Sequence, residues 1–418
     1  MSLTQTLTPP QTTTDNRKYD YDLVIVGGGI VGLTLAAALK NSGLNILLIE
    51  ARVTSAAVSK GQAYAVHMLS ARIFQGIGIW DKILPQIAKY RQVFLSDAEY
   101  PDVVKFQTAD ISTKTPELGY VAEHFALLEP LQEFVQNCQN VTYLCPAEVL
   151  NTQTENDLVT VNIKVDGVEQ KIKTKLLVAA DGSRSRIREA AGIKTKGWKY
   201  WQSCIVAFVK PEKSHNYTAY EKFWPSGPFA ILPLPGNRCR IVWTAPHEEA
   251  KALCALSDEE FLAELTKRYG EQMGKLELLG DRFVFQVQLM QSDRYVLPRL
   301  ALIGDAAHNC HPVGGQGLNL GIRDAAALAE VIQTAHQAGA DIGKIEVLKK
   351  YQSWRKKENL AILGFTDLLD RVFSNNFLPV VVVRRLGLWL MKRVPMLKTF
   401  SLKLMIGLKG KTPELGKM

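Results

Sequence analysis

No two of the six cysteines are spaced as a C-x-x-C pair. Scattered cysteines exclude a disulfide framework and a paired-cysteine zinc site, and they indicate reduced thiols in a cytoplasmic protein. We therefore expect no metal site.

The sequence also lacks a long apolar run. Residues 1–20 are rich in Thr, Gln and Pro, which predicts a disordered lead-in and not a signal peptide. The uncharged stretch near the C-terminus at residues 374–383 is far shorter than the roughly 20 apolar residues of a membrane-spanning helix. We expect no transmembrane segment.

Charge is balanced over most of the chain. Residues 371–418 hold ten Lys or Arg and one acidic residue, Glu414, which equals the whole net charge of +9. So local an excess excludes a general nucleic-acid surface. Large apolar residues alternate with these cations, so the tail is predicted to lie on an anionic membrane surface, making the protein cytoplasmic and peripherally membrane-associated. A helical hairpin packed on the body or on another subunit, in a homo-oligomer or larger assembly, is an equal alternative.

Residues 21–49 contain a dinucleotide-binding fingerprint. Residues 21–26 predict a strand, Gly27-x-Gly29-x-x-Gly32 a tight turn, residues 33–41 a helix, and residues 46–49 a parallel strand. Gly27 permits the turn, Gly29 lets a pyrophosphate approach the backbone, and Gly32 lets the helix pack on the strand. Taken alone, this unit does not distinguish FAD from NAD.

Several residues beside these glycines are predicted to bind the same nucleotide. Glu50 follows the second strand and is placed to accept hydrogen bonds from the ribose hydroxyls. Ile30 and Val31 lie within the turn itself. Arg52 suits the phosphates or the adenine, although a surface arginine is an equal interpretation.

A second glycine-bearing turn lies far along the chain. Residues 296–303 predict a buried strand that ends at Gly304-Asp305, where a carboxylate can accept hydrogen bonds from sugar-like hydroxyls. A helix follows, and its first turn presents free N–H groups and the positive end of its dipole to an anion such as a reduced flavin ring. With both turns present, FAD is the better choice. The cofactor residues predicted here are Asp305, Gly315, Gly317, Leu318 and Asn319.

Three motifs carry a family resemblance. Residues 307–324 read AH-x3-P-x2-GQGLNLG-x-RD, residues 180–182 read ADG, and residues 223–234 read FWP-x-GP-x-A-x-LPL. Together they resemble the ubiquinone-biosynthesis hydroxylases, which are FAD-dependent aromatic-ring monooxygenases of the para-hydroxybenzoate hydroxylase class. The resemblance implies bound FAD, NAD(P)H as co-substrate, and oxygen transfer to a phenolic ring. It also implies that Asp181 contacts the cofactor, and Ser183 is expected to cap the next helix.

One residue departs from the family pattern. Gln62 stands where these hydroxylases commonly carry an arginine near the flavin side chain. Glutamine still forms hydrogen bonds but carries no charge, so we keep Gln62 among the cofactor-binding residues.

A separate substrate module is predicted from short strand-like runs between residues 198 and 243. Tyr220 and Phe223 are expected to face the substrate, together with the loop His311, Pro312, Val313 and Gly314. The sequence does not identify a catalytic acid or base, so the catalytic residues stay unassigned. A structural role is the better interpretation for the histidines.

The predicted fold is α/β, with a Rossmann-like FAD-binding domain, an inserted antiparallel-sheet substrate domain and a C-terminal helical segment. The FAD-binding domain is assigned to residues 21–92, 118–190 and 285–340, the substrate domain to 93–117 and 191–284, and the helical tail to 341–418. Asp166-Gly167 predicts a hairpin. Packing helices are predicted at residues 129–138, 258–269 and 345–369.

The predicted function is hydroxylation of a lipid-soluble, polyprenylated phenol or quinone precursor. A flavoprotein reductase of the same superfamily and a non-catalytic, FAD-containing membrane-associated accessory subunit are the alternatives. A halogenase is disfavoured because its W-x-W-x-I-P pattern is missing.

Overall fold

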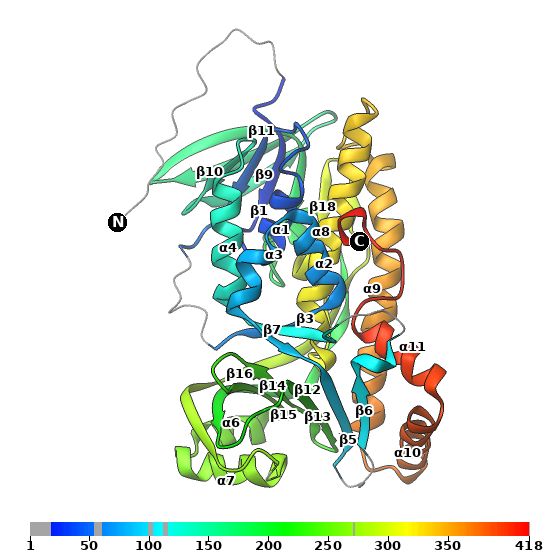
Figure 1. Cartoon of the computed structure of the whole chain (residues 1–418). Coiled ribbons are helices and arrows are strands. Elements are labelled where there is room, and N and C mark those ends of the chain that lie inside the picture. Colours follow the sequence, from blue (N-terminus) through cyan, green and yellow to red (C-terminus); the bar gives the residue numbers. More distant parts are fainter. Residues whose placement is uncertain (1–17, 54–60, 99–102, 112–115, 271, 418) are drawn as a thin grey trace.

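The computed structural model describes residues 18–53, 61–98, 103–111, 116–270 and 272–417. The predicted lead-in therefore lies almost entirely outside the described residues. Two large sheets, one above the other in Figure 1, are flanked on one side by the long helix α9 (Ile345–Phe373). This arrangement confirms the predicted α/β class.

The first sheet forms the nucleotide-binding half. Its strands run in the order β17-β18-β11-β1-β2-β8, and β18, β11, β1, β2 and β8 are mutually parallel neighbours. Where β1, β2 and the end of β11 lie side by side, at residues 23–26, 46–49 and 176–179, the strands are apolar and buried, because a parallel sheet is covered on both faces. The bounds are β1 Tyr21–Val26, β2 Ile46–Ile49, β8 Val141–Leu144, β9 Glu148–Thr154, β10 Val159–Val165, β11 Val168–Ala179, β17 Val296–Leu297 and β18 Leu300–Leu302.

The predicted hairpin joins β10 to β11. Asp166 and Gly167 take positive φ angles of 49° and 84° at its turn, which confirms the Asp-Gly signal. Helix α1 (Ile30–Ala38) packs against α4 (His124–Gln136) and α8 (Gln316–Gln337). The short helix α5 spans Arg186–Ala190.

Two helix starts differ from the sequence prediction. Helix α1 begins at Ile30 and not at residue 33, because the extended Gly29 already serves as its N-cap. Helix α4 begins at His124 and not at residue 129, and it carries Pro130 inside the helix. Proline is most common in a first turn, which is why the predicted start was too late.

The second sheet, in the order β19-β16-β12-β15-β14-β13-β5-β6, contains the predicted antiparallel strands as β12 to β15. Helices α6 and α7 cover the face that carries Phe229, Ile241 and Trp243. The bounds are β5 Gln92–Asp97, β6 Val103–Gln107, β12 Thr195–Pro211, β13 Thr218–Trp224, β14 Gly227–Leu234, β15 Arg238–Pro246, β16 Leu276–Ser292, β19 His308–Asn309, α6 His247–Ala255 and α7 Asp258–Tyr269.

This sheet joins the two segments assigned to the substrate domain, because β5 pairs in parallel with β13. The sheet itself continues past residue 284, since β16 extends to Ser292 and pairs with β19. The other domain boundaries remain a proposal.

A small third sheet, β3-β7-β4, lies between the two large sheets in Figure 1. Helix α2 follows β3 directly. The bounds are β3 Ala63–His67, β4 Ala88–Tyr90, β7 Gly119–Glu123, α2 Met68–Ile77, α3 Trp80–Ile83, and the 3-10 turns η2 Leu84–Gln86, η3 Thr108–Asp110, η4 Gly304–Ala306, η5 Val313–Gly315 and η6 Glu414–Gly416.

The C-terminal segment contains α9, α10 (Leu378–Arg393) and α11 (Pro395–Met405). Helix α9 ends at Phe373, four residues later than predicted. The chain then returns to the body, where a Cβ on Gly76 of α2 would lie 2.1 Å from the Leu415 carbonyl oxygen. None of the helices in the described ranges combines the length and the apolar character needed to span a bilayer.

Two further local predictions are wrong. Residues 296–303 form a hairpin of β17 and β18 and not one strand, because Pro298 cannot donate to a sheet and Arg299 turns the chain at φ 67°. Asp341 holds Arg299 there by two contacts of 2.6 Å. The cap of α5 is Ser185 and not Ser183, since the Ser185 hydroxyl accepts from the Arg188 N–H at 3.0 Å.

Candidate active site between the two sheets

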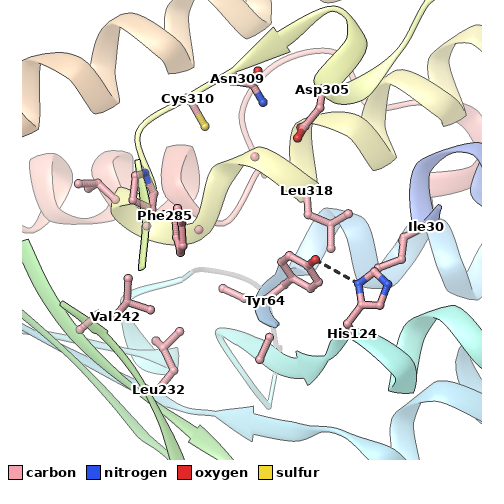
Figure 2. A pocket seen from close by; sticks show the side chains of 18 of the residues that line it. Ile30, Tyr64, His124, Leu232, Val242, Phe285, Asp305, Asn309, Cys310 and Leu318 are labelled. Atoms are coloured by element: carbon pink, nitrogen blue, oxygen red, sulfur yellow. Dashed lines mark hydrogen bonds between the residues drawn. The ribbon is translucent and has the colours of Figure 1, made fainter. Parts of the chain in front are cut away.

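A cavity of about 420 Å³ lies where the parallel strands end and the second sheet begins (Figure 2). This volume falls within the range of small-molecule sites. The nucleotide-binding half contributes Gly29, Ile30, Val31, Ala180, Gly182, Ile303 and Asp305. The second sheet contributes Glu221, Pro228, Ala230, Leu232, Arg240, Val242, Thr244 and Phe285, and the glycine loop contributes Pro312, Val313, Gly314, Gly315, Gly317 and Leu318.

The first glycine turn is built for close approach. A Cβ on Gly27 would lie 2.3 Å from the Ala180 carbonyl oxygen, and one on Gly32 would lie 1.9 Å from the Gly27 carbonyl oxygen. Nothing lies within 4 Å of the same position on Gly29. The protein therefore packs tightly around two of the glycines and leaves the third open toward the cavity.

The carboxylate of Glu50 is held in place by two backbone hydrogen bonds. Its carboxylate accepts from the Gly28 N–H at 2.7 Å and from the Arg52 N–H at 2.9 Å. The side chain of Arg52 is exposed and is not among the residues lining the cavity.

Asp305 and the start of α8 form the opposite wall. The Asp305 carboxylate opens onto the cavity, and removal from bulk water raises its pKa. Gly314 and Gly315 take positive φ angles of 64° and 60°, which bring the loop to the first turn of α8. Gly317 has open space in front of it, since its nearest foreign atom is Cys310 Sγ at 3.9 Å.

The side chain of Asn319 does not face the cavity. Its amide donates to the carbonyl oxygens of Ala65 and Gly315, both at 2.7 Å, and its oxygen accepts from the His67 N–H and the Ser70 hydroxyl. Asn319 therefore ties β3 to α8, and only its backbone is left for a cofactor.

Asp181 and Gln62 also lie outside the lining residues. The Asp181 carboxylate accepts from the Ile187 N–H at 3.5 Å, while the next residue, Gly182, lines the cavity. Gln62 is exposed, and its oxygen accepts from the Tyr64 hydroxyl at 2.9 Å.

Sequence reasoning missed Tyr64 and His124. The Tyr64 hydroxyl lies 3.1 Å from His124 Nδ1, and both side chains line the cavity beside Ile30 and Leu318 (Figure 2). Burial raises the pKa of Tyr64 and lowers that of His124. No motif joins these two residues, because β3 and β7 bring them together only in the folded sheet.

Neither of the two substrate contacts expected on β13 is among the residues that line the cavity. Alternate residues of a strand face opposite sides, and Glu221 is the residue of this strand that lines the cavity. Tyr220 points away from it and stacks edge-on against Phe94. Phe223 shares the face of Glu221 but lies farther along the strand, where it packs against Phe373 with ring centroids 4.1 Å apart.

Arg240 brings a cation to the same sheet face. It is buried, and its Nη1 donates to the Gly61 carbonyl oxygen, next to Gln62. Burial lowers its pKa to about 10, and its Nε has no hydrogen-bond partner among the described residues. The sequence prediction did not single out this arginine.

The histidines of the glycine loop lie behind the cavity wall. His311 is fully buried against Tyr200, and burial lowers its pKa to about 3. Its neighbours Pro312, Val313 and Gly314 do line the cavity. His311 is therefore not a direct contact of a ligand there.

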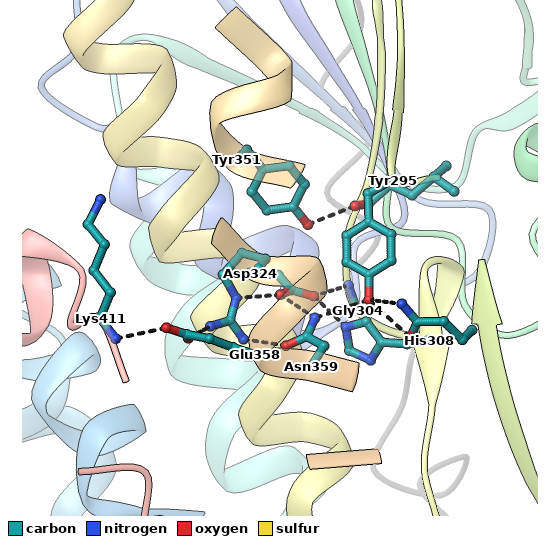
Figure 3. Close-up of polar contacts among 11 residues, drawn as sticks. Tyr295, Gly304, His308, Asp324, Tyr351, Glu358, Asn359 and Lys411 are labelled. Carbon is teal, nitrogen blue, oxygen red and sulfur yellow. Dashed lines mark hydrogen bonds and ion pairs between the residues drawn. The ribbon is translucent and has the colours of Figure 1, made fainter. Parts of the chain in front are cut away.

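His308 belongs to a buried network centred on Asp324 (Figure 3). The Asp324 carboxylate accepts from His308 Nε2 at 2.6 Å, Arg355 Nε at 2.8 Å and the Gly304 N–H at 3.2 Å. Burial alone would raise its pKa, but His308 and Arg355 lower it to about 2. This network fixes the turn that presents Asp305.

The chain is similar to known proteins over nearly its whole length. The FAD binding domain family matches residues 20–365. The ubiquinone hydroxylase UbiL of Rhodospirillum rubrum is 37% identical over 94% of this chain and 91% of its own length. The 3-demethoxyubiquinol 3-hydroxylase of Escherichia coli is 33% identical over 93% and 98%. The chain belongs to the family of FAD-dependent ubiquinone-biosynthesis hydroxylases. It is a flavin-dependent monooxygenase.

Solved structures agree on the fold. The p-nitrophenol 4-monooxygenase PnpA of Pseudomonas putida superposes with a TM-score of 0.76 at 20% identity, covering 93% of this chain and 98% of that one. Aklavinone-11 hydroxylase, solved with FAD and aklavinone, gives 0.69 at 19% identity, covering 84% and 68%. The open space at Gly29 and Gly317 and the Asp305 carboxylate directed into the cavity fit FAD, which is the cofactor of this family.

Proposed function

We propose that this monooxygenase hydroxylates the aromatic ring of a polyprenylated phenol or quinone precursor inside the cavity, at the expense of NAD(P)H and O₂. One observation carries the proposal. The open glycine turns and Asp305 share a single cavity with an apolar sheet face formed by Ala230, Leu232 and Val242. A flat cofactor and a flat apolar ring can therefore meet there.

FAD, when bound, accepts electrons from NAD(P)H and activates O₂. The chain's own residues supply its position. Gly27 makes the turn, Gly29 would receive the nucleotide phosphates and Glu50 the ribose, and Ile30 and Val31 would pack beside them. At the other end, Asp305 binds polar groups of the cofactor, and the first turn of α8 at Gly317 and Leu318 holds negative charge on the reduced ring. Pro312, Val313 and Gly314 keep water from the reacting side.

Oxygen incorporation tests this function. Purified FAD-loaded protein is incubated with NADPH or NADH, a prenylated phenol and ¹⁸O₂, and the product mass is measured by mass spectrometry. We expect one ¹⁸O atom per product and NAD(P)H oxidation that rises with the phenol. Loss of a double bond without ¹⁸O would support the reductase. Absence of any product, with NAD(P)H oxidation that ignores the phenol, would support the accessory subunit.

The names of the relatives support the substrate class. Relatives called ubiquinone hydroxylases, and the mouse ubiquinone biosynthesis monooxygenase COQ6 at 30% identity over 90% of this chain and 89% of its own, cover nearly the whole sequence. A prenylated precursor resides in a membrane, so its hydroxylase needs a route to that surface.

Helices α10 and α11 are proposed to provide that route by lying on an anionic membrane. They expose a group of large apolar side chains, namely Phe377, Leu378, Val382, Val383, Leu386, Trp389, Val394, Met396, Leu397 and Phe400. Arg393 stacks over Trp389 and Lys409 over Phe400, so cations flank the apolar group. This pattern is typical of helices at a lipid interface.

Not every basic residue of the tail is available for lipid. Arg384 pairs with Asp97 and Lys398 with Asp110, so part of the local charge excess binds the body. These pairs hold the helices in place. The apolar side chains, and not the total charge, are therefore the main contribution to the proposed membrane contact.

Liposome sedimentation tests the contact with a matched control. Val383 on α10 and Val168 on the distant hairpin are exposed to 64% and 61%. We expect V383E, alone or with V382E, to reduce binding to vesicles containing anionic phosphatidylglycerol, and V168E to bind like the wild type. Equal binding by all variants would remove the membrane proposal. Concentration-dependent dimerisation that V383E abolishes, without vesicle binding by the wild type, would assign the surface to a second copy of the chain.

A further inference from the structure

The second sheet carries one carboxylate on the face that lines the cavity, beside the apolar side chains of Ala230, Leu232 and Val242. Glu221 of β13 lies opposite Ala230 of β14, and Ala230 lies opposite Val242 of β15. All three side chains line the cavity. Glu221 is therefore an acidic group on the cavity wall opposite the cofactor turns, where a substrate ring would lie.

Among the described residues, no lysine, arginine or histidine lies within ion-pair distance of Glu221, although Glu123, another carboxylate of this region, is paired with Arg238 at 2.7 Å. Among the described residues, the backbone of Gly314 is the group that favours the charged form and so lowers the pKa of Glu221. Glu221 is half-buried and opens onto the cavity. A carboxylate withdrawn from bulk water for a structural role is normally paired, so Glu221 requires another explanation.

Its surroundings place its ionisation near neutral pH. Burial raises the pKa of Glu221 to about 7, although the Gly314 amide opposes the rise. The Tyr90 hydroxyl of β4 is close enough for Glu221 to raise its pKa. The other titratable groups around the cavity are Asp305, Arg240, Tyr64, His124 and the thiol of Cys310, whose pKa burial raises. Of these, Arg240 donates to Gly61, while Tyr64 and His124 contact each other.

We propose that Glu221 is the general base that accepts the hydroxyl proton of the phenolic substrate. This inference rests on the proposed function. The phenol O–H bond breaks, its electron pair stays on the phenolate oxygen, and an O–H bond forms on the carboxylate. No electrons are gained or lost in this step. The phenolate oxygen donates electron density to the ring carbons ortho and para to it. These carbons then react more readily with the oxygen atom that is transferred to the ring.

The proton returns when the ring is restored. After oxygen transfer, the attacked carbon loses its hydrogen as a proton to water and the ring becomes aromatic again. The Glu221 carboxyl then gives its proton to the phenolate oxygen and is a carboxylate once more. A group whose pKa lies close to the working pH is suited to both directions of transfer.

Ligand binding tests the proposal without using activity. The probe is 4-pentylphenol, which stays neutral between pH 5.5 and 8.5 (its pKa is about 10, as for a tyrosine phenol), and its binding to the FAD-loaded protein is followed by the flavin absorbance. A neutral phenol donates to ionised Glu221, so we expect wild-type affinity to rise about tenfold from pH 5.5 to 8.5, as for one charge-assisted hydrogen bond. E221Q should bind with an affinity that does not change with pH.

A matched variant and a kinetic measurement complete the test. Glu259→Gln changes an exposed glutamate of α7 and should keep the wild-type pH dependence. In single turnover, E221Q should hydroxylate the prenylated phenol at least 100-fold more slowly, in line with loss of a general base. A flat wild-type profile, or a wild-type profile and rate in E221Q, would overturn the role of Glu221 alone. Failure of the wild type to bind any phenol would overturn the proposed function as well.

Discussion

The guanidinium of Arg384 on α10 lies 2.7 Å from the carboxylate of Asp97 at the end of β5, and both side chains are almost wholly buried. Arg384 also donates to the carbonyl oxygens of Phe373 and Asn375, which close the turn between α9 and α10. This ion pair therefore links the C-terminal helices to the second sheet. Phe373 packs on Phe223 of β13, so the same junction touches the strand that carries Glu221.

Breaking this pair should destabilise the fold. In Asp97→Ala, Arg384 keeps a buried charge without its carboxylate, and we expect a loss of about 3–5 kcal/mol in the free energy of unfolding. The exposed pair of Lys82 and Glu133 has the same kind of contact, at 2.6 Å, with both side chains more than half exposed. Glu133→Ala should cost less than about 1 kcal/mol. Denaturant unfolding compares the two, and similar losses would contradict the role given to burial.

Asp324 should couple stability to FAD retention. Asp324→Asn removes the charge that meets His308 and Arg355 and weakens the bond to the Gly304 N–H. We expect a loss of roughly 3–5 kcal/mol and weaker FAD binding, because the turn at Asp305 loosens. Asp281→Asn, at an exposed position of β16, is the control. Flavin absorbance after gel filtration measures the retained cofactor, and full retention by Asp324→Asn would refute the coupling.

The same carboxylate gives a pH dependence with a defined sign. The folded pKa of Asp324 is about 2, below its ordinary value of 3.8. A lowered pKa contributes stability above the unfolded value, and this contribution disappears as the pH falls from about 4 to 2. The free energy of unfolding of the wild type should therefore drop over that window more steeply than that of Asp324→Asn. Parallel curves would show that another group controls acid unfolding.

Much of the cofactor side of the cavity could be predicted from the sequence. Gly27, Gly29 and Gly32 have separate steric tasks, and Asp305 follows a strand whose end is marked by glycine. Such local signals can be recognised in the sequence because each depends on residues that are close together in the chain. The sequence does not reveal which face of β13 meets the cavity or how far along the strand the cavity extends. The prediction therefore names Tyr220, on the opposite face, and Phe223, farther along the strand, and misses Glu221.

The remaining cavity residues depend on long-range pairing. Tyr64 meets His124 through the β3–β7 pairing, and Arg240 reaches Gly61 from the second sheet. A one-residue change of register would turn each of these side chains to the other face. The opposite orientation of Asn319 has a similar origin, since its partners at Ala65, His67 and Ser70 come from a distant segment.

Gly29 offers a clean test of the nucleotide end. Its φ of −74° suits any residue, and nothing lies within 4 Å of the place that a Cβ would take. Gly29→Val should therefore fold normally but lose FAD, because the added atoms occupy the space left for the phosphates. Gly364→Val on α9 also meets nothing within 4 Å and lies away from the cavity lining. Circular dichroism should match for all three proteins, and yellow, FAD-loaded Gly29→Val would contradict the predicted site.

Glu221 should leave a signature in stability as well as in binding. Its folded pKa of about 7 lies above the ordinary value of 4.5, so ionisation opposes folding. Below about pH 4.5 both states are protonated and the carboxyl imposes no penalty. As the pH rises to about 7 the unfolded chain ionises first, and the wild type loses up to about 3 kcal/mol relative to a neutral side chain. The free energy of unfolding of E221Q should therefore exceed that of the wild type by a margin that grows between pH 5 and 7 and is constant by pH 8.

Unfolding is measured with equal excess FAD for wild type, E221Q and Glu259→Gln. A difference that stays the same from pH 5 to 8 would mean that Glu221 is not buried in the way its position in the cavity requires.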